Sequence, residues 1–340
     1  MIRTLAHKLR KYYFEYDFFI RSVIAPGSVL PLLKTTVLCL PAVLIFSSIG
    51  FGQEHLPGAT ESVYTSPQKL QDSVRFYAQH DVPNWYDMFV NIPRDWSRSY
   101  SLTFRARNIP AMVGMAVLTA GLVATDDRTW QLSDRLYRNS SLARSASDFF
   151  EYLGDGRPQF GLAGAFALYG FAASDARSLR TASQTVEAIL ACGVVIQVLK
   201  HTTGRQSPIV STKPGGVWDV FPNQIEYHKH VPSYDAYPSG HIATALATVT
   251  VVAENYPEWV WVKPVGYTIV ALIGVSMANT GIHWYSDYPL GLVLGYSFGM
   301  LAAHPEGLED EKSGKEGSLS FSIAPILSSE RTGVGISLSF

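Results

Sequence analysis

Six apolar runs follow one another between residues 109 and 303 of this 340-residue chain, each bounded by polar or Gly/Pro-rich segments. Apolar runs of about 12 residues or more that are separated by turn residues are typical of helices. The pattern therefore predicts an all-α core, a six-helix bundle over residues 109–303. The expected helices lie within residues 109–125, 160–174, 185–199, 242–253, 264–282 and 288–303.

The segments that flank this core have other patterns. Residues 53–108 are mostly polar and lack a long apolar period, which predicts a peripheral region of short helices and loops. Residues 304–317 are rich in Glu, Lys and Gly and predict a solvated linker. In residues 318–340 apolar residues alternate with serines in two stretches, which predicts a short C-terminal β-hairpin.

The N-terminal segment, residues 1–52, combines basic side chains with an apolar stretch that ends in Gly50-Phe51-Gly52. A basic segment, an apolar stretch and two small residues spaced two apart form the pattern of a secretory signal peptide, so we expect cleavage before Gln53. The alternative is an uncleaved signal anchor whose basic end stays in the cytoplasm. Both place the rest of the chain outside the cytoplasm, in the envelope of a bacterial cell.

Composition leaves open whether the helices cross a membrane. Apolar residues make up 47% of the chain and charged residues 16%, and the mean hydropathy of +0.09 lies between values typical of soluble enzymes and of membrane proteins. A span needs roughly 20 apolar residues, and the runs at 109–125 and 264–282, which contain no charged residue, come nearest. We expect membrane association, with a soluble periplasmic bundle as the alternative.

Three polar clusters lie at the ends of the apolar runs, at residues 200–208, 237–241 and 283–287. In the second cluster Ser239 and Gly240 come directly before a predicted helix, where a hydroxyl, free backbone N–H groups and the helix dipole together favour an anion. His241 adds a proton donor beside them. This cluster predicts a phosphate-binding site, and a net charge of −1 argues against general binding of nucleic acid.

The third cluster carries a candidate nucleophile. His283 and Asp287 are four residues apart, so on a helical turn they share one face and the carboxylate can hold one ring nitrogen of the imidazole. The other ring nitrogen is then free to attack phosphorus. With His241 to protonate the leaving oxygen and Lys200 to neutralise charge, the residues predict phosphoryl transfer through a phosphohistidine.

The order and spacing of these motifs resemble the type 2 phosphatidic acid phosphatase superfamily, which also contains bacterial acid phosphatases and vanadium-dependent haloperoxidases. The family signature is Lys, six residues and Arg-Pro; then Pro-Ser-Gly-His; then Ser-Arg, five residues, His, three residues and Asp. The chain matches the first motif with Lys200 and Pro208, the second with residues 238–241, and the third with Ser276, His283 and Asp287.

Two positions depart from the family signature. Its first-motif arginine falls on Ser207 and its third-motif arginine on Met277, so two guanidinium groups that would hold phosphate are missing. One preorganised donor of this kind is worth on the order of 3 kcal/mol in the transition state. Arg205, two residues before Ser207, is the candidate that could bind phosphate in their place.

The resemblance implies roles for the retained residues: His283 as nucleophile, Asp287 as the residue that orients it, and His241 as general acid. It also implies that Lys200, Ser239 and the Gly240 N–H bind phosphate oxygens, and that hydrolysis needs no metal or other cofactor.

The expected function is therefore a phosphatase that hydrolyses a phosphate or diphosphate ester, with a phosphorylated lipid or a small phosphate ester as substrate and an active site that faces the periplasm. Three alternatives stay open at this point: a soluble periplasmic acid phosphatase, a vanadate-dependent haloperoxidase, and a catalytically weak binding or scaffold protein that has lost the arginine clamp.

Overall fold

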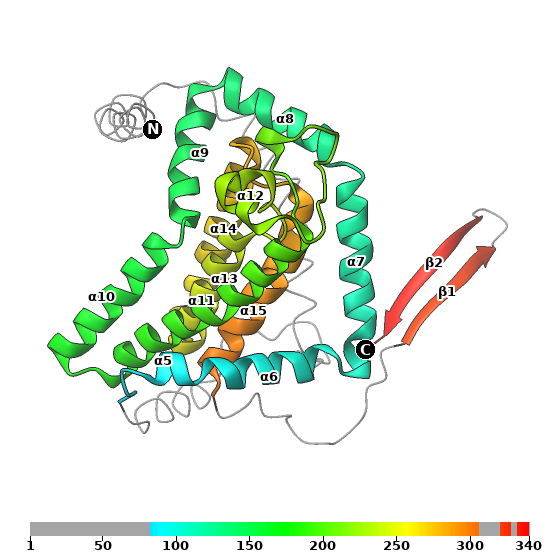
Figure 1. Ribbon diagram of the computed structural model, residues 1–340. Coiled ribbons are helices and arrows are strands. Elements are labelled where there is room, and N and C mark those ends of the chain that lie inside the picture. Colours follow the sequence, from blue (N-terminus) through cyan, green and yellow to red (C-terminus); the bar gives the residue numbers. More distant parts are fainter. Residues whose placement is uncertain (1–81, 306–319, 328–331, 340) are drawn as a thin grey trace, which may run out of the picture.

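The computed structural model describes residues 82–305, 320–327 and 332–339 of the chain (Figure 1). The predicted signal segment, most of the predicted polar region and nearly all of the predicted linker lie outside the described residues. The described core is helical, which confirms the predicted all-α fold. All six apolar runs form helices: α7 (Ile109–Val123), α10 (Arg157–Ala173), α11 (Ala176–Thr203), α13 (Gly240–Asn255), α14 (Val262–Asn279) and α15 (Tyr288–Ala303).

The centre of the molecule is formed by α11, α13, α14 and α15, which pack side by side (Figure 1). Close contact between α13 and α15 depends on three glycines of α15 spaced four apart, Gly291, Gly295 and Gly299. A Cβ at Gly295 would lie 2.3 Å from the carbonyl oxygen of Ala243 on α13, so only glycine allows this approach. The two helices are therefore held backbone to backbone, and their ends carry the candidate site.

Two amphipathic helices, α8 (Asp126–Asn139) and α9 (Ser141–Gly154), lie between the first two predicted helices and were not among the apolar runs. Their apolar positions are interrupted by charged ones, so no continuous run marks them. Both pack against α14, and α8 also contacts the short 3-10 helix η4 (Tyr285–Asp287). This contact brings α8 to the end of the bundle where the polar clusters meet.

The other end of the bundle is crossed by α5 (Asp87–Val90) and α6 (Ile92–Thr103) (Figure 1). Polar contacts fix α6 there: Asp95 is fully buried, and Arg94 is paired with Glu187 of α11 at 3.4 Å. The indole N–H of Trp96 donates to the carbonyl of Ala191 at 3.0 Å. The α6 helix is followed by a 3-10 turn, η1 (Ala106–Asn108), which leads into α7.

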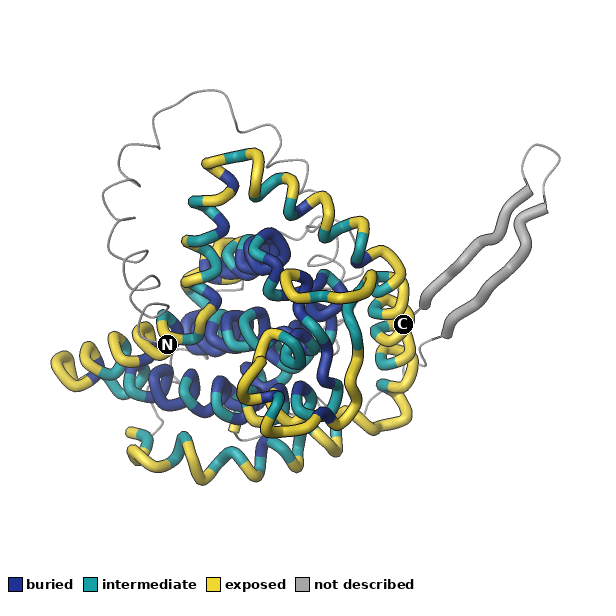
Figure 2. The backbone as a smooth tube through the Cα atoms, turned by 45° about the horizontal axis from the view of Figure 1, so that its top comes forward, coloured by how far each residue is buried: buried dark blue, intermediate teal, exposed yellow. Residues whose placement is uncertain are grey.

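Three of the described helical stretches are long and apolar enough to cross a membrane: Ala106–Val123, Ala176–Thr203 and Val262–Asn279. None of the first stretch is buried inside the molecule. Buried residues gather in the central helices, whereas α7 and α10 present mainly exposed and intermediate positions (Figure 2). An apolar helix with no buried residue is what a lipid environment would stabilise, which agrees with the expected membrane association.

The loop between α11 and α13 covers the end of the bundle that holds the polar clusters. It contains two 3-10 turns, η2 (Pro208–Val210) and η3 (Val231–Ser233), and the short helix α12 (Gln224–Lys229). At the C-terminus, β1 (Ser320–Leu327) pairs antiparallel with β2 (Thr332–Ser339), in the register Ile323 opposite Ile336. This pairing confirms the predicted hairpin.

Candidate active site

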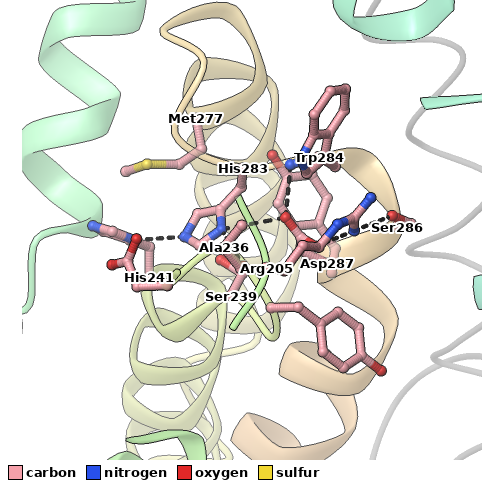
Figure 3. Close-up of polar contacts among 12 residues, drawn as sticks. Arg205, Ala236, Ser239, His241, Met277, His283, Trp284, Ser286 and Asp287 are labelled. Carbon is pink, nitrogen blue, oxygen red and sulfur yellow. Dashed lines mark hydrogen bonds and ion pairs between the residues drawn. The ribbon is translucent and has the colours of Figure 1, made fainter. Parts of the chain in front are cut away.

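The three polar clusters meet at one end of the bundle (Figure 3). Lys200 lies in the last turn of α11, Ser239 is the N-cap of α13, and His283 lies between α14 and α15. Segments that are 40 or more residues apart in the sequence are joined here by direct contacts, including that between His241 and His283. The helix ends, as the sequence predicts, bring the candidate chemistry together.

The His283 imidazole is buried, with 1% of its surface exposed. Its Nδ1 lies 2.7 Å from the carbonyl oxygen of Ala236, and a carbonyl can only accept, so Nδ1 carries the proton. Burial lowers the pKa of His283 to about 3, so the ring is neutral and Nε2 keeps its lone pair. Nε2 accepts a hydrogen bond from Nδ1 of His241 at 3.1 Å. The tautomer is the one a nucleophilic Nε2 requires.

Asp287 was expected to hold His283 by a ring nitrogen, and its position differs from that expectation. Its Oδ2 is 3.5 Å from Nδ1 of His283, while the proton of Nδ1 goes to Ala236. The same Oδ2 accepts from the backbone N–H of Trp284 at 2.7 Å, and Oδ1 is paired with Arg205. Burial raises the pKa of Asp287 to about 6. The Asp287 carboxylate therefore lies beside the His283 ring, while the Nδ1 proton is directed at a backbone carbonyl.

Arg205 is fully buried, and within the described part of the chain its guanidinium is bonded to residues other than the predicted phosphate ligands. Nη1 donates to the Ser286 hydroxyl at 2.6 Å and is paired with Asp287. Nη2 donates to Asp126 at 2.7 Å and to the carbonyl oxygen of Gly215 at 2.9 Å. These contacts differ from the predicted role of Arg205 as a phosphate ligand, because both terminal nitrogens already hold protein acceptors.

The remaining predicted phosphate ligands surround the two histidines. Lys200 is nearly buried, its Nζ lies 3.5 Å from Asp235, and its charge lowers the pKa of His283. The Ser239 hydroxyl caps α13 by accepting from the N–H of Ile242 at 3.5 Å. Within the described residues, the backbone N–H groups of Gly240 and His241 have no carbonyl acceptor. Lys200 and the first turn of α13 thus offer one positive charge and free N–H donors.

The two positions that carry arginine in the family signature are both buried here. Ser207 is built into the loop, where its N–H donates to the carbonyl oxygen of Pro232 at 2.9 Å. Met277 belongs to the apolar core and packs beside Gly154 of α9. Its backbone carbonyl accepts from the N–H of His283 at 3.2 Å, so this position helps to place the candidate nucleophile without contributing a charge.

Residues 182–305 match the family model described as PAP2 superfamily. This segment of the chain is similar to the PAP2 superfamily. The matched segment runs from α11 to the end of α15 and contains all three polar clusters. It begins after α8, so the helix that provides Asp126 lies outside the matched segment.

Two known proteins are similar to parts of this chain. A stretch of 68 residues is 37% identical to part of the lipid A 1-phosphatase of Porphyromonas gingivalis, and the match spans 20% of this chain and 15% of that relative. A transmembrane PAP2-type phosphatidylglycerolphosphate phosphatase from Bacillus subtilis, known from its crystal structure, shares 16% identity with a TM-score of 0.41, over 59% of this chain and 98% of the other.

Asp126 is the residue of this site that the sequence did not point to. It is the first residue of α8, fully buried, and it contacts both Arg205 and Ser286. Nothing in its local sequence, Thr-Asp-Asp-Arg, separates it from an ordinary acidic residue at a helix start. The sequence carries no signal for it, because a buried guanidinium requires carboxylate partners and the burial of Arg205 is seen only in the structure.

Proposed function

We propose that this protein is a phosphatase that hydrolyses a phosphorylated lipid outside the cytoplasm, through a phosphohistidine formed on His283. The observation that carries the proposal is the state of His283: buried, neutral, with its proton fixed on Nδ1 by Ala236 and its Nε2 directed at His241. An imidazole held in this tautomer beside a second imidazole supplies both a nucleophile and a proton donor.

In the first step, the Nε2 lone pair of His283 attacks phosphorus and the bond from phosphorus to the ester oxygen breaks. His241, which takes up a proton when the anionic substrate binds beside it, gives that proton to the ester oxygen, and the group leaves as an alcohol or, from a diphosphate, as a phosphate. Lys200 and the free N–H groups of Gly240 and His241 stabilise negative charge on the remaining oxygens. The phosphorylated ring is cationic, and the carboxylate of Asp287, 3.5 Å away, stabilises that charge.

In the second step, His241 takes a proton from water, and the water oxygen attacks phosphorus. The bond from phosphorus to Nε2 then breaks, which releases inorganic phosphate and restores His283. The contact of 3.1 Å between the two rings leaves no room for a phosphoryl group between them. Entry of the substrate therefore requires that the His241 ring turn away from His283.

A lipid substrate is supported by the surface of the bundle. The apolar helix α7 has no buried residue in its candidate span, and two further helices have the length and hydropathy of membrane spans. An active site at the end of such a bundle would lie near the head groups of a bilayer. The name of the Porphyromonas relative, a lipid A 1-phosphatase, points to the same class of substrate.

The test is the release of phosphate by the full-length chain purified in detergent, with phosphatidic acid, a polyprenyl diphosphate and p-nitrophenyl phosphate as substrates. We expect activity on a lipid substrate that is abolished in His283→Ala and retained in His230→Ala, which changes an exposed histidine of the loop. An acid-labile phosphorylated protein should be trapped from the wild type and not from His283→Ala. Activity that survives His283→Ala would exclude the mechanism.

A second candidate function, a binding or scaffold protein with little turnover, is favoured by one observation. Both family arginine positions are buried and neutral, and Arg205 is held by carboxylates, so Lys200 is the cation whose charge acts on both histidines. The same assays separate the two functions. A protein that binds inorganic phosphate but releases no phosphate from any of the three substrates would favour the scaffold function.

A further inference from the structure

We infer that Asp126 is a positioning residue of the active site, which acts through Arg205 to keep Asp287 in place with its negative charge uncompensated. The inference rests on the proposed function and adds to it a residue of α8 that neither the motifs nor the matched family segment contain.

The contacts of Asp126 connect it to Arg205 and to Ser286, the neighbour of Asp287. Its Oδ2 accepts from Nη2 of Arg205 at 2.7 Å and from the Ser286 hydroxyl, and its Oδ1 accepts from the backbone N–H of Ser286 at 3.3 Å. Ser286 directly precedes Asp287 in η4. One carboxylate therefore fixes the short turn that carries Asp287 and also one end of the guanidinium that contacts it.

Arg205 lies between two carboxylates, with Nη1 on Asp287 and Nη2 on Asp126. All three side chains are fully buried, and the indole rings of Trp218 and Trp284 lie over the guanidinium, at 4.6 and 5.3 Å from its carbon. Little water can screen charges in such a place. When both carboxylates are ionised, the cluster has one negative charge in excess, and Asp287 is its member nearest His283.

Without the Asp126 charge, Arg205 would neutralise Asp287 completely. The excess negative charge beside His283 would disappear, and with it the stabilisation of the cationic ring in the phosphorylated intermediate. The role of Asp126 is therefore a matter of charge as well as position: it divides the positive charge of Arg205 between two acceptors, so that Asp287 still acts on the imidazole.

The groups that face Asp287 come from every element around it. Arg205 and Lys200 stabilise its ionised form, whereas the negative charge of Asp126 opposes it. The His283 ring and the Tyr237 hydroxyl also interact electrostatically with Asp287. Burial is the largest cause of its raised pKa, which is about 6. Removal of the Asp126 charge would leave both cations acting on Asp287 without that opposition, so its pKa would fall.

The experiment compares kcat and KM of wild type and Asp126→Asn across pH, with p-nitrophenyl phosphate as substrate. Asparagine keeps the size of the side chain and one acceptor oxygen, and removes the charge and the second acceptor. We expect kcat to fall on the order of 10- to 100-fold, as the loss of one buried charge near the reaction implies. KM should change less than threefold, and the acid limb of kcat should move to lower pH.

The matched control is Asp95→Asn, which removes another fully buried carboxylate at the opposite end of the bundle. It should leave kcat and the acid limb unchanged. Asp126→Glu, which restores the charge, should recover most of kcat. A wild-type kcat in Asp126→Asn, or a loss of kcat with an unmoved acid limb and no recovery in Asp126→Glu, would overturn the inference. Should Asp126→Asn not fold, a folded but inactive Asp126→Glu would overturn it as well.

Binding of orthovanadate, measured by calorimetry, separates this inference from the proposed function. A wild type that binds vanadate but hydrolyses no ester would contradict the function, and the role of Asp126 would still be tested by affinity. Vanadate bonded to His283 makes the ring cationic, so Asp126→Asn should bind it about tenfold more weakly, a difference of about 1.4 kcal/mol. Equal affinity in the two proteins would contradict the role of Asp126.

Discussion

Nδ1 of His241 lies 3.1 Å from Nε2 of His283, and this contact joins the candidate acid directly to the candidate nucleophile. The two residues come from the first turn of α13 and the loop before α15, so their contact depends on the close packing of these helices. When no phosphoryl group lies between the rings, each ring is thus the hydrogen-bond partner of the other.

The role of His241 as proton donor predicts a dependence on the leaving group. In His241→Ala, kcat/KM, which reports the steps up to departure of the leaving group, should fall about 100- to 10,000-fold for an alkyl phosphate, whose alkoxide is a poor leaving group; this is the usual contribution of general acid catalysis. With p-nitrophenyl phosphate the fall should be much smaller, because nitrophenolate leaves without a proton. Steady-state rates of the two substrates measure the difference. An equal fall for both would assign His241 to binding.

The pH dependence of kcat should have an acid limb near pH 6 that comes from Asp287. Because its pKa is raised to about 6, this carboxyl is ionised above that pH and protonated below it, so activity is lost as pH falls. His283, with a pKa of about 3, is neutral throughout this range and cannot cause the limb. A pH profile from 4 to 8 tests this. An acid limb below pH 4 would exclude Asp287 as its source.

The sequence predicts the positions of the two histidines and Lys200 better than it predicts the ion pairs around Arg205. His241, His283 and Lys200 lie at the boundaries of apolar runs. Because these runs form the helices, the three residues could be placed at helix ends from the sequence alone. The partners of Arg205 could not be predicted in this way. They depend on α8, whose mixed apolar and charged positions give no run, and on a contact between residues 79 apart.

The same limit applies to helix lengths. Residues 185–199 form the apolar part of α11, yet the helix extends from Ala176 to Thr203. Its first turns contain Arg177 and Arg180, which end the apolar run without ending the helix. Arg177 is paired with Glu258 at 2.7 Å, so charges that look solvent-exposed in the sequence are used for tertiary contacts. Apolar periodicity therefore finds the existence of such a helix but not its first turns.

The contact of α15 with α13 predicts a large loss of stability from a very small change. In Gly295→Ala the new methyl group would lie 2.3 Å from the Ala243 carbonyl oxygen, so the helices must separate. The expected cost is about 1 to 3 kcal/mol, seen as a lower midpoint of thermal unfolding in detergent. Gly193→Ala in α11, where a Cβ would meet nothing within 4 Å, is the control. It should be neutral or slightly stabilising.

The orientation proposed for the site can be tested by labelling of intact cells. In a background with Cys39→Ser and Cys192→Ser, Lys229→Cys places a thiol on α12, where the lysine is 59% exposed, and Val117→Cys places one on α7. A maleimide that cannot cross membranes should label position 229 from outside, because the loop over the site faces the periplasm in the proposed orientation. Position 117 should stay unlabelled until the membrane is dissolved, because α7 would be surrounded by lipid. Labelling of position 229 only after cell lysis would reverse the orientation, and equal labelling of both positions would argue for a soluble bundle.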